Sequence, residues 1–152
     1  MVPTGALIGL DAVTAAAVGN IHSVRMVTRK PIQGLAGAPY IVENNIDIAG
    51  LTEPLRIFAG TARDAAKGFP ANLNVAVALS LAGIGPDRTT LEIWADPTVT
   101  RNVHRIEVES DSARFSMTIE NIPSENPKTG LITALSVIAW LRKQRAALRV
   151  GT

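Results

Sequence analysis

Histidine is the first side chain to consider as a catalyst, because its ordinary pKa of about 6.5 lies close to neutral pH. The sequence contains two, His22 and His104. His104 lies in the segment NVHRIEV, which reads as a strand and places it on the same face as Asn102 and Ile106. Two explanations remain open from the residues alone: a general acid/base, or a polar side chain on a solvated strand. His22 has no motif around it and is predicted to be structural or exposed.

Cationic side chains at the ends of predicted elements are candidates for binding an anion. Arg29 and Lys30, in TRKP, end a predicted strand, and Lys128 and Thr129, in NPKTG, begin the last predicted helix. A helix N-terminus offers free N–H groups and a favourable dipole to anions, which makes Lys128 the stronger candidate. A solvated strand end is the competing explanation for Arg29 and Lys30.

Asn74 is a candidate for recognising an amide-bearing ligand. It lies in FPANLNVA, at the start of a predicted helix, and its side chain offers both a donor and an acceptor. Helix capping is the alternative, although Asn72 is better placed to be the cap.

Composition narrows the classes of function. Cysteine is absent, which excludes disulfides, thiolate catalysis and zinc–thiolate sites, and the separated histidines give no metal-binding spacing. The formal charge is only +2 and aromatic residues make up 4% of the chain, so no nucleic-acid surface is expected. No apolar run could span a bilayer, and the apolar N-terminus lacks the positive start of a signal peptide, so we expect a cytoplasmic protein without membrane segments.

These candidates must be positioned by one domain, because 152 residues with 47% hydrophobic side chains fit a single core. Thr4 is the expected cap of the first helix, and Thr61 with Asp64 resembles a capping box. The elements predicted from periodicity are helices at 5–18, 62–68, 72–85 (apolar on nearly every side, hence buried) and 127–146, a short piece near 40–48, and strands at 22–30, 55–60, 89–95, 101–110 and 113–121.

The order of these elements predicts an α+β (mixed α/β) fold. Strands that follow one another from 89 to 121 indicate an antiparallel meander, with Asp111-Ser112 as a hairpin turn. The sheet is therefore expected to be mixed or largely antiparallel, with helices on one face and a long C-terminal helix beside it.

The C-terminal helix is apolar on more than one side. Asn126 and Pro127 suit its start, and only Thr133, Ser136 and alanines interrupt its apolar surface before Arg142. Such a helix needs cover on two sides. We expect one face, including Trp140, to be exposed or buried in a dimer, and the helix to dock another domain.

Four segments together resemble the C-terminal domain of L-aspartate dehydrogenase. They are TGALIGLDAV, GTARDAAKGFPANLNVAVALSLAGIG, ADPTVTRNVHRIEV and ENIPSENPKTGLITALSVIAWL. The resemblance implies an oxidation of L-aspartate to iminoaspartate that depends on NAD or NADP and serves NAD biosynthesis. It implies that His104 is the catalytic residue and that Asn74 contacts the dinucleotide, with a further cofactor contact in GALIG at Ala6 or Ile8. It also implies a homo-oligomer.

One part of that family's pattern is missing from this sequence. Members begin with a Rossmann domain that carries a glycine-rich phosphate-binding turn, and no GxGxxG occurs here. The expected state is therefore a separated or truncated domain, inactive alone, whose C-terminal helix docks a Rossmann domain in cis or in trans. Two alternatives remain: a non-catalytic module that oligomerises or binds a small acid, and a dehydrogenase for another amino acid.

Overall fold

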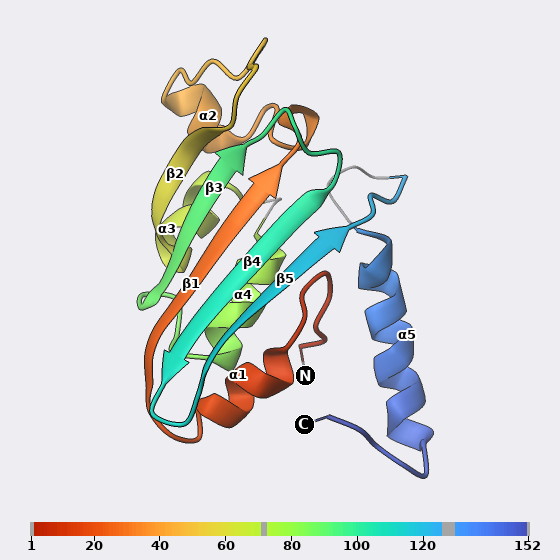
Figure 1. Cartoon of the computed structure of the whole chain (residues 1–152). Helices are drawn as coiled ribbons and strands as arrows, with labels where there is room; N and C mark the ends of the chain where they lie inside the picture. Colours follow the sequence, from red (N-terminus) through yellow and green to blue (C-terminus); the bar gives the residue numbers. More distant parts are fainter. Residues whose placement is uncertain (1, 71–72, 126–129, 152) are drawn as a thin grey trace.

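In the computed structural model, which describes residues 2–70, 73–125 and 130–151, five strands form one mixed sheet (Figure 1). The sheet order is β2-β3-β1-β4-β5, with β1 and β3 parallel and the other neighbours antiparallel. The strands are β1 (Ile21–Lys30), β2 (Leu55–Thr61), β3 (Thr89–Ala95), β4 (Asn102–Ser110) and β5 (Arg114–Asn121). The helices are α1 (Leu10–Ala16), the short 3-10 helix η1 (Ile32–Gly34), α2 (Pro39–Glu43), α3 (Ala62–Gly68), α4 (Asn74–Ala82) and α5 (Leu131–Arg145). The α+β class and the mixed sheet are as predicted.

The predicted meander is wrong in one respect. β4 and β5 form the predicted hairpin at Asp111-Ser112. β3 does not pair with β4, because β1 lies between them, and β3 pairs with β1 and β2 instead. The alternation of apolar and polar side chains along each strand is local and can be recognised in the sequence. The choice of pairing partner is not local, because β1 joins the sheet from about 65 residues away.

Helix ends differ from the prediction where backbone geometry decides them. α1 begins at Leu10, because Gly9 has a left-handed φ of 67°, which a right-handed helix cannot contain. A Cβ at this position would collide with the Met117 side chain, which favours glycine here. The backbone carbonyl of Thr4, the expected cap, accepts a turn hydrogen bond from the Leu7 amide. The predicted cap of α3 is confirmed, since the Asp64 amide donates to Thr61 Oγ1 at 3.2 Å.

Helices α1, α3 and α4 lie behind the sheet and form the core with its inner face (Figure 1). α4 contributes buried Ala76 and Leu79, but Val77 and Leu81 are 41% and 64% exposed. The prediction of a fully buried helix is therefore wrong on one side of α4.

α5 stands beside this layered body (Figure 1), and none of its residues is buried. It begins at Leu131, later than predicted, and the expected capping residues Asn126 and Pro127 lie outside the described residues. Its exposed apolar side chains are Leu131, Ile132, Leu135, Val137, Ile138 and Leu141. The expected exposure of an apolar face is therefore confirmed, but Trp140, which was expected to belong to this face, is half-buried.

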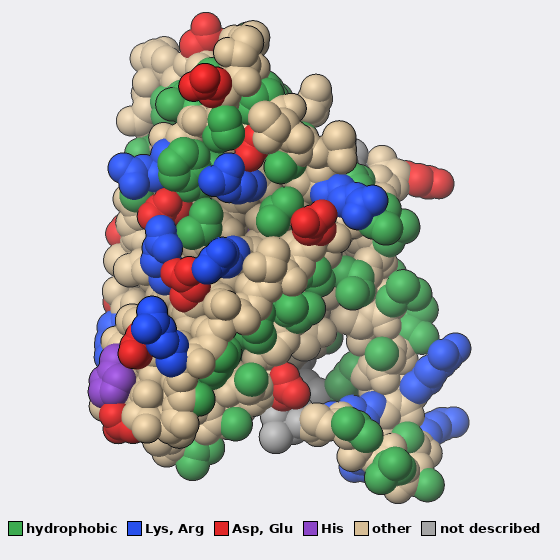
Figure 2. Space-filling model, in the orientation of Figure 1, with side chains coloured by type: hydrophobic (Ala, Val, Ile, Leu, Met, Phe, Trp, Pro, Cys, Tyr) green, Lys and Arg blue, Asp and Glu red, His purple; other side chains and the backbone are tan. Residues whose placement is uncertain are grey.

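The outer face of the sheet carries charged side chains of both signs (Figure 2). Arg25 donates to Glu92 at 2.8 Å and to Glu107 at 2.9 Å, which lie on the neighbouring strands. His22 is also exposed and lies 2.6 Å from Asp111. Within the described residues, no helix is both long and apolar enough to cross a membrane.

Candidate active site

A cavity of about 240 Å³ lies where β1 and β5 end and β4 begins, on the helix-covered face of the sheet. Four residues singled out from the sequence line it: Ala6, Lys30, Asn74 and His104. Its other polar lining residues are Thr4, Asn102, Asn121 and Thr133. Residues far apart in the chain therefore meet in one small polar cavity.

Strand register explains why these side chains meet. β1 and β4 pair Thr28 with His104 and Arg29 with Val103, so the next pair along is Lys30 with Asn102. β4 and β5 pair Asn102 with Asn121. Because alternate residues share a face, Lys30, Asn102 and Asn121 form one polar row across three strands, and Thr28 and His104 lie in the adjacent row.

His104 is a buried imidazole rather than a solvated one. It is 3% exposed, and its Nδ1 lies 3.1 Å from Oγ1 of fully buried Thr28. Burial, together with the positive charge of Lys30, lowers the pKa of His104 to about 3. The ring is therefore neutral near pH 7, and the contact with Thr28 fixes its orientation.

Lys30 supplies positive charge to the cavity. It is 3% exposed, and burial lowers the pKa of its ammonium to about 8. Neither the described ion pairs nor the described cavity lining offers it a carboxylate. A buried cation without a protein counter-ion favours an anionic ligand.

Asn74 and Ala6 lie at the cavity in different ways. Asn74 is the first residue of α4 and is exposed, while Leu73 occupies the N-cap position, so Asn74 does not cap the helix. Asn72 lies outside the described residues. Ala6 contributes its backbone, whose carbonyl accepts a hydrogen bond from Asn121 Nδ2 at 2.9 Å. Ile8 is half-buried and is not among the residues that line the cavity.

Arg29 is separated from this cavity, because it points to the opposite face of the sheet from Lys30. Its Nη1 donates to Asp96 at 2.9 Å, and its guanidinium lies 5.3 Å from the centre of the Trp94 ring. Lys128 and Thr129, the other predicted anion-binding residues, lie outside the described residues.

Sequence reasoning missed Thr28 and Asn121 as members of the site, and it placed Asn102 beside His104 without giving it a role. The missing information was the pairing of β1 with β4, which brings Thr28 and Lys30 to His104 and Asn102. Period-two alternation alone could already have grouped Thr28 with Lys30.

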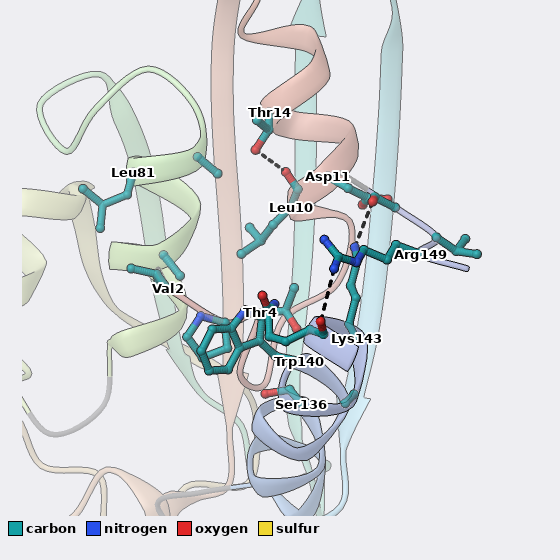
Figure 3. Close-up of a pocket in the computed structure, with 17 residues that line it drawn as sticks. Val2, Thr4, Leu10, Asp11, Thr14, Leu81, Ser136, Trp140, Lys143 and Arg149 are labelled. Carbon is teal, nitrogen blue, oxygen red and sulfur yellow. Dashed lines mark hydrogen bonds between the residues drawn. The ribbon is translucent and has the colours of Figure 1, made fainter. Parts of the chain in front are cut away.

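A larger hollow of about 830 Å³ adjoins this cavity between α1, α4 and α5 (Figure 3). Val2, Pro3, Thr4 and Ala78 line both spaces. At its rim Lys143 Nζ donates to the Gly151 carbonyl at 2.8 Å, and Arg149 donates to that of Gln144 at 3.1 Å. The described residues contain no group of metal-ligating side chains.

A mixed sheet with helices on one face, and with a polar cavity lined by His104 and Lys30 where its strands end, defines an α+β domain. The model of the family "Aspartate dehydrogenase, C-terminal" matches residues 11–144, and the chain belongs to this family.

Relatives extend this result. The chain is 83% identical over 152 residues to an L-aspartate dehydrogenase of Bradyrhizobium diazoefficiens, and 71% identical to L-aspartate dehydrogenase 3 of Bordetella bronchiseptica. It covers 54% and 56% of those proteins, so it spans about half the length of the curated relatives it matches. The crystal structure of aspartate dehydrogenase from Thermotoga maritima aligns with a TM-score of 0.78 at 28% identity, over 98% of this chain and 55% of that one.

Proposed function

We propose that this chain is the substrate-binding and catalytic part of a cytoplasmic, NAD(P)-dependent L-aspartate dehydrogenase of NAD biosynthesis, which oxidises L-aspartate to iminoaspartate. The observation that carries the proposal is the meeting of His104 and Lys30 in one cavity. A dicarboxylate needs a cation, and an amine that is to be oxidised needs a base. The relatives named L-aspartate dehydrogenase support the same reaction.

Lys30 binds a substrate carboxylate in this proposal. The ammonium keeps most of its charge at neutral pH, because its pKa of about 8 lies above that pH. A bound carboxylate offsets the cost of burying this charge.

His104 takes the proton that the substrate ammonium must lose. This role requires the tautomer in which Nδ1–H donates to Thr28 Oγ1, 3.1 Å away, and Nε2 keeps its lone pair. Substrate carboxylates beside the ring raise its pKa from about 3 towards neutrality, so the base becomes effective when a dicarboxylate is bound. Once it has released this proton to solvent, the same nitrogen can activate water against the imine, which yields oxaloacetate and ammonia.

The residues at the cavity fit the nicotinamide end of a dinucleotide and no more of it. The exposed amide of Asn74 can pair with the nicotinamide carboxamide, and the backbone near Ala6 lies at the same opening. The bound cofactor supplies the hydride acceptor. Because the sequence has no glycine-rich turn for the pyrophosphate, we infer that a Rossmann domain, in cis or in trans, holds the remainder of the dinucleotide against α5 and the larger hollow. We also propose that the protein forms a homo-oligomer.

A chimera tests this function. The remaining part of the Bradyrhizobium diazoefficiens relative is joined to this chain, and reduction of NAD and of NADP is followed with a panel of amino acids. We expect turnover with L-aspartate. Turnover with a different amino acid would replace the proposed substrate, and a folded chimera that is silent with every substrate would favour a non-catalytic acid-binding module.

A further inference from the structure

Asn102 is a largely buried residue whose side-chain amide makes no hydrogen bond to the described residues. It is 6% exposed, lines the cavity, and lies two residues before His104 on the inner face of β4. Its amide atoms are not among the described buried polar atoms that lack a partner, so the amide is open to the cavity that it lines. An amide that faces a cavity and is not bound to the described protein can donate to a ligand.

Asn121, directly opposite Asn102, is bound to the protein through one end of its amide, while its Oδ1 is buried without a partner among the described residues. Its Nδ2 donates to the Ala6 carbonyl at 2.9 Å and so ties the N-terminal segment to β5. Asn102 makes no such bond to the described part of the protein. The two amides therefore have different tasks despite their shared row.

On its other side Asn102 faces Lys30, according to the register that pairs Arg29 with Val103. Both side chains end in N–H donors, both are more than nine-tenths buried, and the described lining of the cavity holds no carboxylate. Two adjacent donors, one cationic and one neutral, match the two oxygens of a single carboxylate.

We propose that Lys30 and Asn102 hold one carboxylate of the substrate between them: the ammonium binds one oxygen and Asn102 Nδ2 donates to the other. This inference rests on the proposed function and makes Asn102 a substrate-binding residue. It orients the acid, so that the carbon bearing the amine lies towards His104 in the adjacent row.

The first experiment measures succinate binding by titration calorimetry, with Asn102→Leu compared with the wild-type chain. Succinate is a dicarboxylate without an amine, so its binding reports carboxylate recognition alone. We expect Asn102→Leu to weaken binding roughly 10- to 100-fold, as for loss of a hydrogen bond to a charged group. Its melting temperature should be almost unchanged, because the Asn102 amide makes no hydrogen bond to the described part of the protein. Asn121→Leu is the matched control and should lower the melting temperature.

Three outcomes would overturn the inference: succinate binding by Asn102→Leu at wild-type affinity, a loss of stability equal to that of Asn121→Leu, or weaker binding of L-aspartate with succinate unaffected. The last would assign Asn102 to the amino group. The KM for L-aspartate of the Asn102→Leu chimera provides the same comparison during turnover. An active wild-type chimera with an unchanged KM in this variant would refute the inference and leave the proposed function standing.

Discussion

Replacement of Lys30 by methionine should make the protein more stable. Methionine fills a similar volume in the cavity wall but carries no charge. The pKa of Lys30 falls from 10.5 to about 8 because of burial, and each pKa unit corresponds to about 1.4 kcal/mol. The buried charge therefore costs on the order of 3 kcal/mol of unfolding free energy at neutral pH.

The dependence on pH gives this prediction its sign. Between pH 8 and 10.5 the unfolded chain holds the Lys30 proton and the folded one releases it, so the free energy of unfolding rises with pH across this window. Below pH 8 both states are protonated and the whole penalty is present. Lys30→Met should thus gain about 3 kcal/mol below pH 8 and lose this advantage as pH approaches 10.5.

Urea denaturation of both proteins at pH 7, 8, 9 and 10 measures the difference. Lys67→Met is the matched control, because the Lys67 side chain is 74% exposed and the same change there should leave stability almost unaltered. A Lys30→Met protein that is less stable than wild type at pH 7, or whose stability runs parallel to wild type across the window, would show that Lys30 is not a buried, unneutralised charge.

Three further outcomes concern the proton and the cofactor. The pKa of His104 is lowered to about 3, so the unfolded chain takes up a proton there before the folded one does, and the free energy of unfolding should fall as pH drops from 6.5 to 3. In an acid titration followed by circular dichroism, His104→Gln should lose less stability than wild type over this range. His104→Ala in the chimera should lower kcat by roughly 10²- to 10⁴-fold with little change in the Kd for NAD, and near-normal turnover would make His104 a bystander. The isolated chain, titrated with NADH and followed by fluorescence, should show no micromolar binding, because Asn74 alone cannot hold a dinucleotide; tight binding would contradict the need for a second domain.

Much of the fold follows from local patterns. The strands expected at 89–95, 101–110 and 113–121 lie within a residue of β3, β4 and β5, because alternation of apolar and polar side chains is written into each segment. The cap formed by Thr61 and Asp64 is equally local. Partner choice in the sheet is not, and the meander prediction failed there.

The candidate site shows the same difference between what local patterns reveal and what depends on strand pairing. His104 and Asn74 were identified by resemblance and Lys30 by its charge, and all three line one cavity. Arg29 and Lys30 were treated as one pair, yet alternation from Val24 and Met26 already places Lys30 inward and Arg29 outward. The roles of Thr28 and Asn121 depend on neighbours that come together only after the sheet has formed.

The central position of β1 affects how this protein must be made. Arg25 on β1 binds Glu92 and Glu107, which are 67 and 82 residues further along the chain. During synthesis β1 therefore leaves the ribosome long before β3 and β4 exist, with both hydrogen-bonding edges unpaired. Folding has to wait for most of the sequence and then close long loops, which makes it slow compared with that of a helical bundle. In this interval the nascent chain is most exposed to aggregation and most dependent on chaperones.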